Sequence, residues 1–173
     1  ETPKTLDNVE SHITGSVRQL CETAKRVSSD LGYEPVLLST DLYGEAREVG
    51  SFLAAIAKTY VRDKACRSLA FIAGGETVVR ITGNGLGGRN QESALSAARG
   101  IDGIPDCAVF SVGSDGTDGP TDAAGGICTG ESLSQLKAKG IDVDEILQNN
   151  DSYHALERID SLIITGPTGT NVN

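Results

Sequence analysis

A glycine-rich stretch that ends in an arginine has the composition of an anion-binding loop: Gly83-Asn84-Gly85-Leu86-Gly87-Gly88-Arg89. Residues 83–88 are called the glycine loop. Glycine lets a ligand approach the backbone, and the helix predicted over 91–99 would direct unpaired N–H groups and its positive dipole end at that ligand. Arg89 would add a planar guanidinium suited to phosphate or carboxylate. We therefore predict that the amides of residues 85–88 hold an anion and that Arg89 clamps it. The alternative is a glycine-rich turn beside a surface arginine.

A second loop, at 113–126, carries three carboxylates, Asp115, Asp118 and Asp122, among glycines and threonines. We call it the aspartate loop. Its spacing fails the calcium-binding EF-hand pattern, whereas magnesium needs only one or two carboxylates together with phosphate oxygens and water. Carboxylates this close repel each other, and a cation or a hydroxyl-rich ligand would relieve that repulsion. The loop predicts a cation or substrate site; the alternative is a loop whose aspartates bond their own backbone.

Three better-known motifs are incomplete in this sequence. Gly83, Gly85 and Gly88 match the spacing of the dinucleotide fingerprint, but Asp106, near the required distance, precedes a predicted strand instead of ending one. No P-loop lysine follows the glycines. Ser114 lacks the second glycine of a nucleophile elbow. The partial match to the dinucleotide fingerprint keeps a nicotinamide-dependent enzyme as a rival hypothesis.

The segments that would position these loops alternate between strand and helix patterns, as in an α/β fold. Apolar residues at helical spacing predict long helices over 17–31 and 44–62. Further helices are predicted at 132–139, at 142–147 and from 154, and strands at 9–14, 35–39, 69–73, 76–82, 107–112 and 161–165. The strands at 69–73 and 76–82 are too close for a parallel crossover, so we expect an antiparallel hairpin or a bend. Ligands bind beyond the carboxyl ends of parallel strands, so the loops after these strands are expected to converge.

The composition narrows the classes of function. The 173-residue chain has a net charge of −9, which argues against nucleic-acid and membrane-surface partners. It shows neither a run of about 18 apolar residues nor a leader with a charged and then an apolar part. Scattered cysteines indicate free thiols in a reducing cytoplasm, and isolated histidines argue against zinc. These residues are Cys21, Cys66, Cys107, Cys128, His12 and His154. The chain has no methionine and ends inside a polar loop, so we expect a fragment.

Five motifs, taken in order, carry a resemblance to a known family. They are Gly74-Gly75-Glu76, the stretch 83–92, the stretch 113–125, Asn149-Asn150-Asp151-Ser152-Tyr153 and the stretch 165–173. The set resembles the MOFRL domain, the C-terminal domain of class II glycerate 2-kinases, a family often labelled hydroxypyruvate reductase. The resemblance implies a layered αβα fold of the α/β class with a mixed, mostly parallel sheet. Residues 67–173 would be the MOFRL domain, truncated at its end, and residues 1–66 the end of a preceding Rossmann-like domain.

The same resemblance implies a reaction. The γ-phosphoryl of ATP would pass to D-glycerate, giving 2-phosphoglycerate, with Mg²⁺ present and in a cleft shared with the missing N-terminal domain. The isolated fragment is expected to be inactive, because the family carries a functional lysine in that domain. The alternatives are an NAD(P)-dependent hydroxypyruvate reductase and a non-catalytic ligand-binding fragment. Small molecules are the expected partners, the location is expected to be cytoplasmic, and homo-oligomerisation is left open.

Within this hypothesis the candidate residues take three roles. Arg89, Asp115 and Asp118 are predicted to be catalytic, and Asp115 and Asp122 to bind the metal. The predicted substrate and phosphate ligands are Gly85, Gly87, Gly88, Asn90, Glu92, Thr117, Asp122, Thr168, Thr170 and Asn171.

Overall fold

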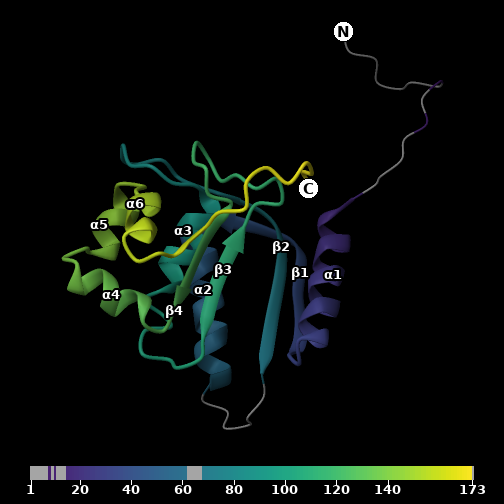
Figure 1. Cartoon of the computed structure of the whole chain (residues 1–173), viewed down its shortest axis with the longest axis horizontal. Coiled ribbons are helices and arrows are strands. Elements are labelled where there is room, and N and C mark those ends of the chain that lie inside the picture. Colours follow the sequence, from purple (N-terminus) through teal and green to yellow (C-terminus); the bar gives the residue numbers. More distant parts are fainter. Residues whose placement is uncertain (1–7, 9, 11–14, 62–67, 173) are drawn as a thin grey trace.

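The fold, seen in a computed structural model that describes residues 8, 10, 15–61 and 68–172, is mixed α/β (Figure 1). Its helices are α1 (Val17–Asp30), α2 (Ala46–Val61), α3 (Arg89–Ala97), α4 (Ser132–Ala138), α5 (Val143–Gln148) and α6 (Ser152–Glu157). Its strands are β1 (Glu34–Glu45), β2 (Leu69–Val78), β3 (Ala108–Val112), β4 (Gly125–Thr129) and β5 (Leu162–Ile163). The predicted fold class is confirmed. His12, Cys66 and all but residue 10 of the strand predicted at 9–14 lie outside the described residues.

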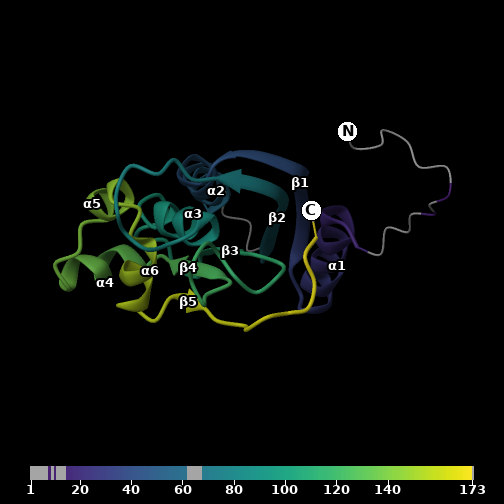
Figure 2. The same cartoon turned by 90° about the horizontal axis from the view of Figure 1, so that it is seen from above.

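The first sheet is a parallel pair of long strands, β1 and β2. The pairing runs from Glu34 opposite Leu69 to Glu45 opposite Val78. Helix α1 packs on one side of this pair, and α2, which follows β1 in the chain, lies on the other side (Figures 1 and 2). The long pair thus has the strand–helix–strand connection that the sequence pattern predicted.

Strand β2 is continuous where the sequence predicted two strands. The glycines that suggested a turn, Gly74 and Gly75, lie inside it, and Gly75 has a φ of +153°. A Cβ on Gly75 would lie 2.1 Å from the carbonyl oxygen of Leu42, so only glycine fits this close approach of the two backbones. The glycines therefore serve an irregularity in a parallel pair, and the predicted antiparallel hairpin is wrong. Residues 79–82 are irregular rather than strand.

The second sheet is antiparallel, in the order β3-β4-β5. Strand β4 was not predicted, because Gly125 and Gly126 read as part of a loop. A Cβ on Gly125 would lie 1.9 Å from the Ser111 carbonyl oxygen, and one on Gly126 would lie 2.5 Å from Leu156. These glycines are therefore required by packing around β4, although their type suggested a turn.

Helix α3 lies between α2 and the second sheet and is buried from its second residue to its last (Figure 2). Small residues allow α2 to approach it, since a Cβ on Gly50 would lie 2.0 Å from the Ser93 carbonyl oxygen. The hydroxyls of Ser93 and Ser96 donate to the carbonyls of Ala46 (3.0 Å) and Arg47 (2.7 Å) at the start of α2. Helix α3, which follows the glycine loop, is thereby fixed against α2.

The two predicted domains are in close contact. Strand β1 pairs with β2, and α2 packs on α3, so both contacts cross the predicted boundary between residues 66 and 67. The boundary itself stays a prediction. In the described part of the chain, no helix combines the length and the apolar character needed to cross a bilayer.

Candidate anion-binding site

A polar turn at 149–152, which we call the asparagine turn, holds the glycine loop in place. The amide of Gly85 donates to the carbonyl of Asn149, and the amide of Leu86 donates to the carboxylate of Asp151, each at 2.8 Å. Backbone groups that a ligand was expected to use are therefore bonded within the chain. No site role was predicted for this turn, although its run of Asn and Asp residues is a signal of local backbone bonding.

Asn150 is the centre of these contacts. Its side-chain oxygen accepts hydrogen bonds from the amides of Thr82 (2.7 Å) and Gly83 (3.0 Å), just where the glycine loop begins. Its amide nitrogen donates to the carbonyl of Arg80 and to the carboxylate of Glu92. The backbone of Asn150 has a φ of +55°, a conformation that asparagine tolerates better than most residues. One buried amide side chain thus ties the loop to the middle of α3.

The glycines of the glycine loop make room for the chain itself. A Cβ added to any of them would collide with residues from the asparagine turn or the aspartate loop. The distances would be 2.4 Å from Gly83 to Asn149, 2.4 Å from Gly85 to Asp151, 2.2 Å from Gly87 to Ser152 and 2.3 Å from Gly88 to Asp118. Packing within the chain therefore already requires glycine at these positions, and the close approach of a ligand stays a prediction. The same crowding counts against a pyrophosphate-binding fingerprint.

The carboxylate of Asp118 occupies the N-terminus of α3. This residue is 1% exposed; one oxygen accepts from the backbone and side-chain nitrogens of Asn90 (both 3.1 Å), and the other accepts from the amide of Gln91 (2.8 Å). Gly88, at the N-cap position, has no side chain, so Asp118 performs the capping. Burial raises the pKa of Asp118, while the bonds from Gln91 and Asn90 and the charge of Arg89 lower it. These are the contacts of a helix cap; a catalytic role for Asp118 stays a prediction.

Two predicted substrate ligands, Asn90 and Glu92, face the interior. The side-chain oxygen of Asn90 accepts from the hydroxyl of Ser111 at 2.6 Å. Glu92, 2% exposed, forms an ion pair with Arg47 of α2 at 3.2 Å, and Arg47 also donates to the carbonyl of Leu147. Removing one partner of a buried pair leaves an uncompensated charge and is strongly destabilising. Both side chains thus link parts of the chain, and their contact with substrate stays a prediction.

Three amides and one guanidinium of the predicted anion site are left open. Among the described residues, the backbone N–H groups of Gly87, Gly88 and Arg89 have no hydrogen-bond acceptor; Gly87 and Arg89 are partly exposed, whereas Gly88 is buried. The Arg89 side chain is 40% exposed, and its guanidinium lies 3.0 Å from the carboxylate of Glu76 on β2. Half-exposed ion pairs of this kind contribute little stability, so a bound anion can replace Glu76 as the partner of Arg89.

The loops that follow β3 and β5 meet, as the sequence predicted. The amide of Thr168 donates to the carbonyl of Asp115 at 3.1 Å, and the hydroxyl of Thr168 donates to the carbonyl of Ser114. The amide of Val172 donates to the hydroxyl of Ser114 at 3.0 Å. The C-terminal segment then reaches α1 across the top of the molecule in Figure 1. Thr170 and Asn171 are exposed, and their contact with substrate stays a prediction.

The two predicted metal ligands have separate partners in the chain. The carboxylate of Asp115 accepts from the amide of Thr117 at 3.1 Å, which is the local bonding that the alternative interpretation expected. Asp122 is exposed and accepts from the hydroxyl of Tyr153 at 2.8 Å, which raises the pKa of Tyr153. Within the described residues, no three His, Cys, Asp or Glu side chains are grouped as a metal would need. The chain could therefore supply only part of a Mg²⁺ coordination shell, with phosphate oxygens and water completing it.

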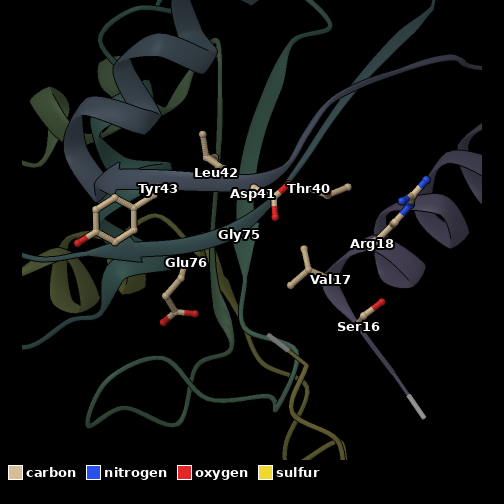
Figure 3. Close-up of a pocket in the computed structure, with 9 residues that line it drawn as sticks. All are labelled: Ser16, Val17, Arg18, Thr40, Asp41, Leu42, Tyr43, Gly75 and Glu76. Carbon is tan, nitrogen blue, oxygen red and sulfur yellow. Dashed lines mark hydrogen bonds between the residues drawn. The ribbon is translucent and has the colours of Figure 1, made fainter. Parts of the chain in front are cut away.

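A cavity of about 470 Å³, open to solvent, includes Glu76, the ion-pair partner of Arg89, in its lining. Its walls come from the start of α1 and from the carboxyl-terminal parts of β1 and β2 (Figure 3). Ser16, Asp41 and Glu76 are among the residues that line it, and Glu76 is the residue that pairs with Arg89. The open anion site and the cavity therefore share a wall, at the sheet edge where α/β folds bind ligands.

Comparison with known proteins agrees with the motif order. The profile described as "MOFRL family" matches residues 69–173. A D-glycerate 2-kinase of Thermotoga maritima is 52% identical over 175 residues, which cover 100% of this chain and 42% of that protein. A glycerate 2-kinase of Pyrococcus horikoshii is 43% identical, with 97% and 39% covered. A protein of Agrobacterium vitis that is named as a hydroxypyruvate reductase is 42% identical over a shorter stretch, 156 residues.

The solved structures agree with the fold. The crystal structure of a glycerate kinase from Thermotoga maritima superposes with a TM-score of 0.89 at 50% identity, covering 99% of this chain and 42% of that one. The chain thus spans about two fifths of the length of the relatives it matches. The described fold, both loops and the asparagine turn all lie within the matched part.

Proposed function

The chain belongs to the MOFRL family, and from this membership we propose that it is the C-terminal part of a glycerate kinase. The reaction transfers the γ-phosphoryl of ATP to D-glycerate and gives 2-phosphoglycerate. The observation that carries the proposal is the open donor set at the start of α3, where the amides of Gly87, Gly88 and Arg89 stand beside a half-exposed guanidinium. The 52% identity to a D-glycerate 2-kinase supports the same reaction.

Phosphoryl transfer depends mainly on positioning and on neutralising charge. Arg89 clamps the transferring phosphoryl group or the glycerate carboxylate, and the open amides of Gly87 and Gly88 donate to its oxygens. Asp118 positions those amides by capping α3, and Asn150 positions the loop from the other side. These donors act from a fixed backbone, so the anion is bound without reorganisation of the loop.

The aspartate loop contributes negative charge, opposite in sign to that of Arg89. Asp115 and Asp122 each present a carboxylate with one hydrogen bond among the described residues, so both keep capacity for Mg²⁺ or for the attacking hydroxyl. When bound, Mg²⁺ would neutralise charge on the ATP phosphates. Thr117 adds a hydroxyl within this loop, and Thr168, Thr170 and Asn171 form a second polar wall beside it, from which hydroxyls and an amide can reach a substrate. The proposal includes ATP as the phosphoryl donor, Mg²⁺ as the cofactor and a cytoplasmic location. It also includes the N-terminal domain of the whole protein as the other side of the cleft.

Arg89 offers the direct test. In the whole protein that carries this sequence, Arg89→Ala is expected to lower kcat/KM for D-glycerate-dependent ADP production by about 100-fold, as removal of a charge-stabilising donor does. The kcat/KM of Arg89→Lys should lie between those of the wild-type protein and Arg89→Ala, because a lysine keeps the charge but not the planar fork. Arg26→Ala is the matched control, since Arg26 is an exposed arginine of α1 whose one ion pair among the described residues is with Asp30.

The same preparation separates the kinase from the reductase. NADH oxidation with hydroxypyruvate is measured beside ADP release with D-glycerate. ADP release that depends on glycerate, without NADH oxidation, supports the proposal. NADH oxidation alone would establish the reductase, and full ADP release by Arg89→Ala would reject the clamp.

A further inference from the structure

Strand β1 has a bulge at the cavity. Ser39 pairs with Ala73 and Leu42 pairs with Gly75, so two β1 residues, Thr40 and Asp41, stand opposite a single β2 residue. Such bulges redirect side chains and are over-represented beside functional sites. Figure 3 shows Asp41 pointing from β1 into the space between the strands and α1. The sheet is thus irregular at the point where it presents a carboxylate to the cavity.

Several side chains in the cavity lining carry hydrogen-bond acceptors, among apolar residues such as Val17 and Leu42. Asp41 and Glu76 supply carboxylates, and Ser16, Thr40 and Tyr43 supply hydroxyls. Asp41 accepts from Thr40 at 3.2 Å and forms no ion pair among the described residues. The guanidinium of the lining residue Arg18 points away from Glu76 in Figure 3. This lining suits a ligand that donates hydroxyl hydrogens and disfavours a phosphate or carboxylate inside the cavity itself.

The size of the cavity selects between the two substrates of the proposed reaction. About 470 Å³ is the volume of a site for a drug-sized molecule, whereas a three-carbon acid would leave most of it filled with water. A nucleoside has the required size and carries ribose hydroxyls. Tyr43, 77% exposed at the rim, offers a ring face on which a base can stack.

We propose that the cavity at the carboxyl ends of β1 and β2 binds the ribose and base of a nucleotide, with Asp41 accepting from a ribose hydroxyl. The phosphates then leave the cavity past Glu76 and reach Arg89 and the open amides of Gly87 and Gly88. This inference rests on the proposed function, since it names where that reaction's nucleotide lies. With the nucleotide in the cavity, the aspartate loop remains available to bind D-glycerate, the smaller substrate.

Calorimetric titration of ATP into the whole protein tests the placement. Asp41→Asn is expected to raise the Kd for ATP by about tenfold, the loss of one hydrogen bond to a charged group. The control is Asp102→Asn, an exposed aspartate outside the cavity, which should leave the Kd unchanged. Tyr43→Ala should weaken ATP binding and Tyr43→Phe should preserve it. Equal melting temperatures of the variants confirm that the fold is retained.

Deoxynucleotides identify the contact. For the wild-type protein, either 2′-deoxy-ATP or 3′-deoxy-ATP should bind about tenfold more weakly than ATP, and Asp41→Asn should bind that analogue and ATP equally. An Asp41→Asn variant with unchanged ATP affinity would overturn the inference. If Asp41→Asn raises the KM for D-glycerate alone, the inference is also overturned, while the kinase proposal stands. If Asp41→Asn weakens ATP binding in a protein that transfers no phosphoryl group to D-glycerate, the cavity assignment stands and the kinase proposal fails.

Discussion

Replacing Asp118 by alanine should destabilise the fold strongly, although Asp118 lies in a loop. Its carboxylate accepts from the backbone amides of Asn90 and Gln91 and from the side chain of Asn90, all in a buried setting. Alanine would remove the helix cap and leave these donors without an acceptor. Because Gly88 offers no side chain at the N-cap position, nothing else on that residue can take over.

The magnitude follows from these contacts. Loss of a cap costs about 0.5–2 kcal/mol, and each buried donor left unpaired adds about 1–3 kcal/mol. Partial entry of water into the space left by the carboxylate reduces the sum, so we expect a loss of about 3–5 kcal/mol in the free energy of unfolding. For a chain of this size, that loss lowers Tm by about 10 °C.

Guanidinium denaturation followed by far-UV circular dichroism measures the effect. Asp118→Asn keeps the shape and one acceptor oxygen, so it should lose about 1–2 kcal/mol. Asp122→Ala is the control from the same loop: Asp122 is exposed with a single bond to Tyr153, and the change should stay below about 0.5 kcal/mol. If Asp118→Ala unfolds within 1 kcal/mol of the wild-type protein, on the scale of an ordinary surface change, the capping role is refuted.

Two further outcomes follow from the same contacts. Asn150→Gly keeps the φ of +55° without strain but removes the side-chain bonds to Thr82, Gly83, Arg80 and Glu92. We expect the free energy of unfolding to fall by about 2–4 kcal/mol and the amides of Thr82 and Gly83 to exchange hydrogen faster. Unchanged exchange at these two amides would contradict the role given to Asn150. The raised pKa of Asp118 means that the folded protein holds this proton to higher pH than the unfolded chain, whose value is 3.8. The stability of the wild-type protein relative to Asp118→Asn should therefore be greatest below pH 3.8 and decline as pH rises through the folded-state pKa of Asp118. Denaturation of both proteins at several pH values measures this difference. A difference that grows with pH would show that folding lowers the pKa of Asp118.

The sequence by itself determined the local features of this protein. Helical spacing located α1 and α2, the runs of apolar residues located β3 and β5, and the order of five motifs indicated the family. Each of these depends on residues near one another in the chain, where periodicity and turn chemistry act. Gly74 and Gly75 predicted a hairpin or a bend, because the residue type alone could not distinguish a reversal of the chain from a close approach to a bulged β1.

Only the tertiary structure decided which polar residues are free to bind a ligand. Asp115, Asp118 and Asp122 are alike in sequence, yet Asp118 is buried against α3, Asp115 bonds its own loop and Asp122 meets Tyr153. The partners that separate them lie far along the chain: Asn90 is 28 residues from Asp118, as Thr82 is 68 residues from Asn150. A hydrogen bond across such a separation depends on how whole helices and strands pack, and no local pattern specifies it. The glycine loop therefore looked like a cradle for a ligand, whereas most of its contacts are with the chain, and the amides at residues 87–89 remain for an anion.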